Sequence, residues 1–129
     1  MGEWWEPEPW GTWTGTEAGL VIQVAQDVKS DLILEAVAGA FVNEKNPEIT
    51  VQVRVNDLPI GVWNFRYKAG TEPYQVYTAT IPKKALDQPI PQTIWFQVSG
   101  ARSPSGLGMG GDPRMLGMAV VRMRIIPHP

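Results

Sequence analysis

Apolar and polar residues alternate in short segments along the chain, and this alternation restricts what the chain can fold into. Val51, Val53 and Val55 are separated by the polar residues Gln52 and Arg54. A period of two is typical of a β-strand that buries one face. Such segments follow one another between turns rich in Pro, Gly and Asn. The pattern predicts about eight strands, of which the clearest span 19–25, 32–42, 51–55, 60–67, 74–81, 93–99 and 118–126.

These strands, with no convincing long helix among them, predict an all-β fold. The apolar run Leu32–Val42 fits helix or strand by pattern alone, and its β-branched residues together with Gly39 favour a central strand covered on both faces. A helical turn is expected at 82–87. In the last strand, alternation places Val121 with Met123 on the inner face. We therefore expect an antiparallel two-sheet β-sandwich of the jelly-roll type.

Length and composition describe one ordinary globular domain over residues 1–129. Hydrophobic residues make up 43% and charged residues 19% of the chain, and the net charge is −2. The 11 basic residues are scattered, which argues against a nucleic-acid partner. The absence of cysteine excludes disulfides, thiolate metal sites and a cysteine nucleophile. No apolar run approaches the roughly 20 residues of a membrane helix, so we expect no direct membrane insertion.

Two segments stand apart from the strand pattern. Residues 1–17 form an arm rich in Trp and Pro, which opens abruptly and is compatible with a domain excised from a longer protein. Residues 100–117 contain a glycine-rich loop that we expect to be mobile. Asp112 followed by Pro113 predicts a helix N-cap, and Gly117 would end that helix after one turn.

Asp112 and Arg114 have two interpretations. In the structural one, Asp112 caps the turn while Arg114 pairs with an acid such as Glu8. In the functional one, both side chains reach out to the hydroxyl groups of a sugar. A turn that links two strands favours the structural interpretation.

The six tryptophans also have either a structural or a functional interpretation. Trp10 and Trp13 are expected in the core or at its edge. Trp95 alternates with apolar neighbours, so it fills a second layer or lies on an outer face. An exposed indole is a platform for the apolar face of a sugar ring, and Trp95 and Trp63 are the candidates for stacking. Trp5, beside prolines, is expected to be exposed, which makes it a third candidate for ligand binding, or to pack on a neighbouring domain.

Catalytic patterns are weak in this sequence. The single histidine, His128, lies near the end of the chain, which makes a Ser-His-Asp triad improbable. Gly106, Gly108 and Gly111 match G-x-G-x-x-G, but a strand and not a long helix follows them. We therefore expect no catalysis, no metal and no cofactor, with a small hydrolase as the outside alternative.

Two blocks of residues resemble those of a known domain. Trp5-Glu-Pro-Glu-Pro-Trp-Gly-Thr-Trp13 is similar to a W-x-x-x-E-x-W-G-x-W opening, and Ser103-Pro followed by Asp112-Pro-Arg-Met-Leu-Gly117 is similar to an S-P…D-x-R-x-L-G closing. The segment Val53-Arg-Val-Asn56 matches a V-x-V-N element between them. Together they resemble a carbohydrate-binding-module-like β-sandwich domain of bacterial membrane glycosyltransferases and phosphoglycerol-transferase-like proteins.

The resemblance implies a non-catalytic module that binds or positions polysaccharide at the bacterial cell surface. Its partners would be a polysaccharide or oligosaccharide and the catalytic domain of a parent protein, in the periplasm or at the cell surface. The positions shared with that domain would hold the fold; they are Glu8, Trp10, Trp13, Asp112 and Arg114. The alternative is a purely structural domain that packs on its parent enzyme, or self-associates through the arm, and has no glycan site.

Overall fold

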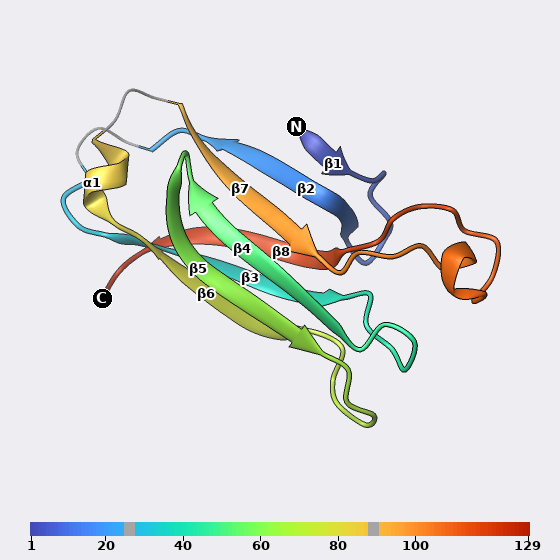
Figure 1. Ribbon diagram of the computed structural model, residues 1–129. Coiled ribbons are helices and arrows are strands. Elements are labelled where there is room, and N and C mark those ends of the chain that lie inside the picture. Colours follow the sequence, from blue (N-terminus) through green and yellow to red (C-terminus); the bar gives the residue numbers. More distant parts are fainter. Residues whose placement is uncertain (25–27, 88–90) are drawn as a thin grey trace.

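The computed structural model describes residues 1–24, 28–87 and 91–129, and it is built from antiparallel strands. The all-β expectation is confirmed, as is the helical turn at 82–87, which is α1. The end of the strand expected at 19–25 lies outside the described residues. The elements are β1 (Gly2–Trp4), β2 (Thr12–Ile22), β3 (Leu32–Ala40), β4 (Glu48–Val55), β5 (Leu58–Arg66), β6 (Gln75–Ile81), α1 (Lys83–Leu86), β7 (Gln92–Ser99), η1 (Ser105–Leu107) and β8 (Met118–Pro127) (Figure 1).

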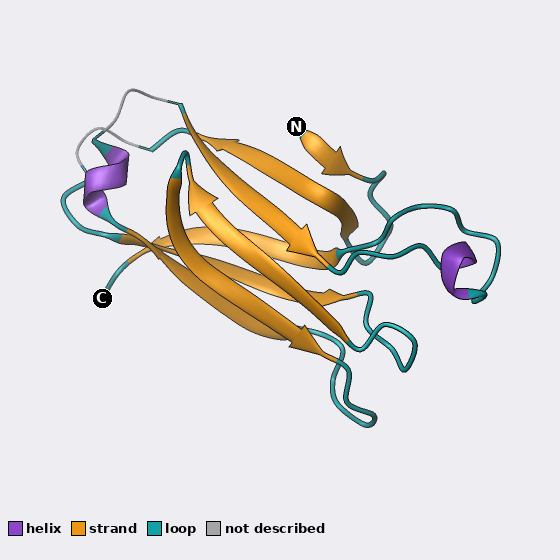
Figure 2. Ribbon diagram, viewed as in Figure 1, coloured by secondary structure: helices purple, strands orange, loops and turns teal. Residues whose placement is uncertain are grey.

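One continuous sheet contains all of these strands. Their order is β5-β4-β7-β2-β8-β3-β6, with β1 added to β2. The strand β2 takes part in both layers of Figure 1, because residues 17–22 pair with β7 while Thr12 and Trp13 pair with β8. The two separate sheets of a jelly roll are therefore not confirmed. The sheet curls into a nearly closed barrel, and α1 and η1 lie at its opposite ends (Figure 2).

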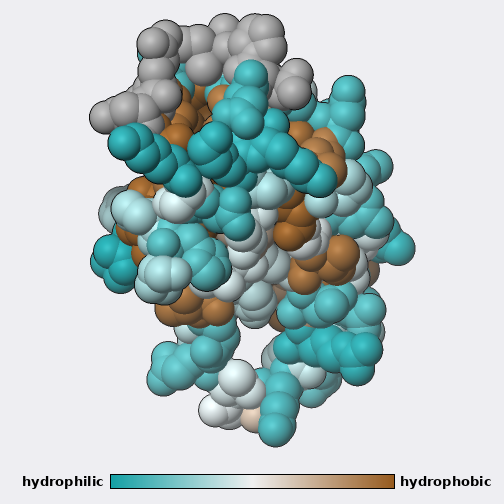
Figure 3. All heavy atoms as spheres, turned by 90° about the vertical axis from the view of Figure 1, so that its left-hand side faces the viewer, coloured by the Kyte–Doolittle hydropathy of each residue, from teal (hydrophilic) through white to brown (hydrophobic). Residues whose placement is uncertain are grey.

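The two terminal strands of the sheet, β5 and β6, meet at a seam closed by side chains. Trp63 on β5 donates its indole Nε1–H to the carbonyl oxygen of Thr78 on β6 at 2.9 Å. Inward residues of β4 and β7 fill the interior, as their alternation predicted, and those of β3 join them. The strand β3 lies inside the sheet as expected, but it is buried on one face only, because its outward residues Ile33, Glu35 and Val37 are partly exposed. Seen from the end that carries α1, hydrophobic atoms reach the surface in separate patches among hydrophilic ones (Figure 3).

The predicted alternation fails at one point in β8. A β-bulge interrupts its pairing with β3, where Val37 pairs with Arg122 and Ala38 with Val120. Val121 is the extra residue, and it is 38% exposed instead of facing inward. A bulge shifts the alternation by one residue. Val120 therefore faces inward before the bulge and Met123 after it, and the expected inward position of Val121 is wrong.

The loop between β7 and β8 projects beyond one end of the sheet (Figure 1). The backbones of Arg102 and Leu116 pair at its base, and Lys45 donates to the carbonyl oxygen of Leu107 at 3.1 Å. The helix expected after Asp112 does not form; the loop contains the short η1 instead. No helix in the described ranges has the length and hydrophobicity that a membrane crossing requires.

Candidate functional site

A polar face with Trp95 near its centre lies on the outside of strands β2, β7 and β4. Trp95 alternates with buried neighbours on β7, so its side chain points outward, one of the two positions expected for it. Across the sheet it pairs with Gly19 of β2 on one side and with Arg54 of β4 on the other. The register thus brings together three residues from distant parts of the chain.

The indole of Trp95 lies against a bare stretch of backbone. A Cβ atom placed on Gly19 would lie 2.9 Å from carbons of the Trp95 ring and also from Cγ of Met1, so glycine leaves room for both side chains there. On the other side, the Arg54 guanidinium carbon lies 5.6 Å from the ring centroid, within the range of a cation–π contact. Trp95 is partly buried, and its ring is held in place on the sheet surface.

Polar side chains continue this face in the adjacent rows. Arg54 Nη2 lies 3.8 Å from Glu17 Oε2, and both side chains are partly exposed. Gln97 pairs with Glu17 on one side and with Gln52 on the other, and both glutamines are exposed. Amide, guanidinium and carboxylate groups present planar sets of donors and acceptors. Beside an aromatic ring, this arrangement suits a ligand with an apolar face and several hydroxyl groups.

The hydrogen bonding of its indole N–H distinguishes Trp95 from three other tryptophans. Trp4 donates to the carbonyl oxygen of Gly19 at 3.0 Å, and Trp5 donates to that of Met115 at 2.9 Å. The Trp63 indole is bonded across the β5–β6 seam. The Trp95 indole makes no hydrogen bond with any of the residues that the structure describes, so its N–H is free to donate to a ligand.

Trp63 does not belong to the candidate site. Its side chain faces inward from β5, and the residue is only 3% exposed. The ring packs near Phe96 and Tyr77, with centroid separations of 5.9 Å in both cases. Alternation along β5 assigns Trp63 and Phe65 to the same buried face. The hypothesis that Trp63 stacks on a ligand is therefore wrong, because neither face of its ring is accessible.

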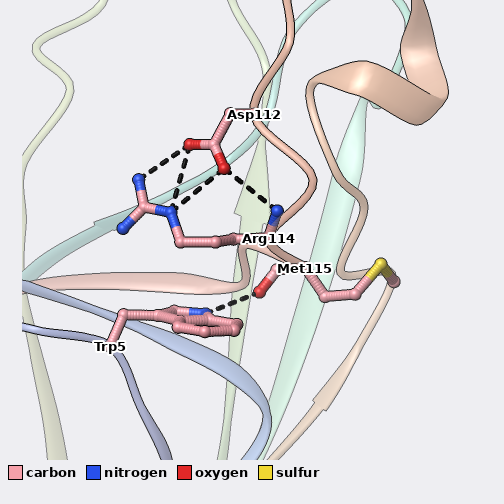
Figure 4. Close-up of polar contacts among 4 residues, drawn as sticks. All are labelled: Trp5, Asp112, Arg114 and Met115. Atoms are coloured by element: carbon pink, nitrogen blue, oxygen red, sulfur yellow. Dashed lines mark hydrogen bonds and ion pairs between the residues drawn. The ribbon is translucent and has the colours of Figure 1, made fainter.

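Asp112, Arg114 and Trp5 form a separate cluster that joins the N-terminal arm to the β7–β8 loop (Figure 4). Both carboxylate oxygens of Asp112 accept hydrogen bonds from the Arg114 side chain, the shortest at 2.7 Å. The backbone N–H of Arg114 donates to the same carboxylate at 3.0 Å. The Arg114 guanidinium carbon lies 5.9 Å from the Trp5 ring centroid. These groups satisfy one another, which favours the structural interpretation.

The expected ion pair between Glu8 and Arg114 is not present in the described structure. Asp112 takes that place because its side chain turns back onto the residue two positions later, as Asp commonly does in a turn. The pKa of Arg114 is raised mainly by its hydrogen bonds to Asp112 and also by the charge of Glu8, so Glu8 acts on Arg114 without a direct ion pair. The backbone of Glu8 closes the turn before β2 through paired hydrogen bonds of 2.7 and 3.0 Å with Gly11. The hydrogen bonds from the Arg114 side chain, and then that from its backbone, lower the pKa of Asp112.

Asp112 should make stability depend on pH. A carboxyl whose pKa is lowered by folding stabilises the protein above its ordinary pKa of 3.8, and this contribution is lost as the pH falls through the lowered value. We expect Asp112→Asn to reduce the melting temperature at pH 7 and to match the wild type more closely as the pH falls below 3.8. Calorimetry from neutral to acidic pH measures this. Glu44→Gln, at an exposed acid without a described ion pair, is the control; a constant difference at all pH values contradicts the prediction.

Trp10 and Trp13 form an aromatic group at the end of the sheet. Their rings meet edge to face with centroids 5.5 Å apart, and Trp10 stacks on Tyr74 at 6.2 Å. Trp13 also contacts Phe41 edge to face. Both tryptophans are partly buried, which places them at the edge of the core as the sequence predicted.

The residues around Trp95 were missed by sequence reasoning. Glu17, Gln52, Arg54 and Gln97 each occupy a polar position in a strand, and nothing in the linear pattern shows which strands are neighbours. The available signal was Gly19, a glycine inside a strand pattern, which often marks a close approach of another group. Only the register pairs that glycine with Trp95.

Groups typical of catalysis are dispersed. His128 is exposed beyond β8. Across the described ranges, no three Asp, Glu or His side chains gather closely enough to hold a metal ion. Comparisons with protein-family models, with curated proteins and with solved structures found no match. The likeness to glycosyltransferase accessory domains therefore stays a prediction.

Proposed function

We propose that this domain is a non-catalytic carbohydrate-binding module, with the face around Trp95 as its site. The observation that carries the proposal is a partly exposed indole fixed against Gly19, with a free N–H and with Arg54 beside it. Sugar rings present apolar C–H faces to aromatic rings while their hydroxyl groups bind planar polar side chains. Gln52 and Gln97 supply such side chains in the next row.

A shallow face of this kind binds weakly. We expect dissociation constants in the millimolar range, which correspond to about 4 kcal/mol. Such a module is useful when it is attached to an enzyme and holds that enzyme on a polymer of many repeating units, since multivalency raises the effective affinity. In this proposal the parent is an extracytoplasmic enzyme that makes or modifies bacterial surface polysaccharide, in keeping with the resemblance of the two sequence blocks.

An NMR titration of the labelled domain against bacterial polysaccharides and oligosaccharides tests the site. We expect saturable shifts of the Trp95 indole signal and of the amides of Gln52 and Gln97. Trp95→Ala should weaken binding at least about fivefold through the lost stacking. Trp10→Ala, which removes an indole outside this face, should leave binding unchanged. Shifts confined to Trp10, or none with any glycan of the panel, would contradict the proposal.

A second candidate function, a domain that packs on a partner polypeptide, is favoured by a different observation. An apolar groove of about 810 Å³ lies between the N-terminal arm, β2 and β8. This groove shares Gly19 with the Trp95 face, so the two functions are tested with variants of residues that belong to only one of the two sites.

A further inference from the structure

The sheet is incomplete between β2 and β8. These strands are neighbours in the sheet order, but their pairing is recorded only at Thr12–Val120 and Trp13–Ala119. The strand β8 pairs with β3 along its whole length. Its other edge, over residues 122–127, has no strand partner within the described part of the chain. An unpaired edge presents backbone N–H and C=O groups that another strand can bind.

The short strand β1 occupies the first part of this gap. It pairs antiparallel with β2, and the N–H of Gly19 donates to the carbonyl oxygen of Met1 at 3.1 Å. The Glu3 carboxylate fixes β1 by accepting hydrogen bonds from the backbone and side chain of Thr16. Because backbone groups alternate along a strand, the next N–H on this edge of β2 belongs to Val21. That group has no backbone partner in the described structure, and Val21 is 51% exposed.

The floor of the gap is apolar. The groove of about 810 Å³ is bounded by Trp4, Leu20, Val21 and Met123 among others. A second hollow of about 280 Å³ shares Leu20 and Met123 with it and extends the apolar surface to Ile22 and Ile125. Side chains of the core therefore reach solvent beside the unpaired edge of β2, next to the end of β1. Glu6 contributes the one charged side chain among the described residues that line the larger groove, the Met1 ammonium also borders this groove, and Arg124 borders the smaller hollow.

We propose that this gap receives an extended segment of a partner polypeptide, which adds to the edge of β2 in line with β1 and covers the core toward β8. The groove of about 810 Å³ and the hollow of about 280 Å³ beside these edges provide the space for an extended segment. The backbone groups at Val21 and on β8 need hydrogen-bond partners, which a peptide has and a lipid chain lacks. Apolar side chains at alternate positions of this segment would pack on the apolar floor. A lysine or arginine at one end would complement the negative charge of Glu6.

A synthetic peptide provides the probe: about seven residues, with lysine at one end and valine alternating with threonine. We expect saturable NMR shifts at Val21, at residues 122–126 and at the Trp4 indole. The Val21 amide should exchange with solvent about tenfold more slowly. A peptide of the same composition with two central residues replaced by proline cannot pair and should not bind. Equal responses to both peptides, or no response at millimolar concentration, would overturn the proposal.

A matched pair of variants tests the hydrogen bond directly. Val21→Pro removes the one outward N–H and leaves the side facing β7 intact, so the fold should persist while peptide binding is lost. Val21→Thr keeps the N–H and the β-branched shape, and it should bind the peptide like the wild type. Unchanged peptide binding by a folded Val21→Pro variant would overturn the proposal. Slower amide exchange of residues 122–126 at higher protein concentration, without peptide, would also overturn it, because it would identify a second copy of this chain as the occupant.

Discussion

Trp63→Ala should lower the free energy of unfolding by roughly 3–5 kcal/mol, the range for loss of a large aromatic side chain from a core. The expected loss lies toward the upper end because Trp63 has two functions. Its ring fills the interior beside Phe96, and its N–H makes the 2.9 Å hydrogen bond that joins β5 to β6 at the seam. Urea denaturation followed by circular dichroism measures the change.

Trp63→Phe separates these two contributions. Phenylalanine keeps an aromatic ring in the core but cannot donate to Thr78. The lost hydrogen bond should account for about 1 kcal/mol, with a further cost for the smaller ring. A loss below about 1 kcal/mol for Trp63→Ala would contradict the placement of this residue at a closed seam.

Gly11→Ala should release the N-terminal arm from β8. A Cβ atom at Gly11 would lie 2.1 Å from the backbone oxygen of Val120, and the φ angle of Gly11 is +151°. Strain at such an angle costs about 1–3 kcal/mol, and the clash with a backbone atom adds to it because neither the turn at Gly11 nor β8 can move away easily. The indole signals of Trp4 and Trp5 should lose their native shifts.

Gly111→Ala is the control for this experiment. Its Cβ atom would meet no heavy atom within 4 Å, and its φ angle is not in the positive range. Alanine there should leave stability unchanged or raise it slightly, since it restricts the unfolded chain. If Gly11→Ala and Gly111→Ala behave alike, the close approach of the arm to β8 is not needed for folding.

The strands were predictable because alternation of apolar and polar residues depends only on local geometry. The buried positions of β4 and β7 follow the pattern along their whole length. In β8 the pattern fails because the bulge at Val121 depends on β3, a partner that the sequence of β8 does not reveal. The continuous sheet was missed for a similar reason, since nothing local shows that β2 pairs with β7 and β8 along different segments.

The candidate site was predictable only in part. Alternation placed Trp95 outside Ile94 and Phe96, whereas Trp63 was put forward for stacking although it shares its inward face with Phe65. Asp112 and Arg114 were recognised as a possible cap and pair, but the partner of Arg114 was assigned to Glu8. Arg114 pairs with Asp112 in its own turn and not with Glu8, which is distant in sequence. Local turn geometry therefore predicts this ion pair better than the similarity of the two sequence blocks did.

The dual pairing of β2 also constrains how the chain is made. This strand ends at Ile22, but its partners β7 and β8 begin at Gln92 and Met118. Contacts between segments so distant in sequence form late and slow the search for the native state. During synthesis the first strands therefore emerge from the ribosome with their hydrophobic face uncovered, and the sheet closes only when residues near 120 have followed. Until then the β4–β5 hairpin is the largest unit that can form from neighbours in sequence, and it is the natural starting point for folding.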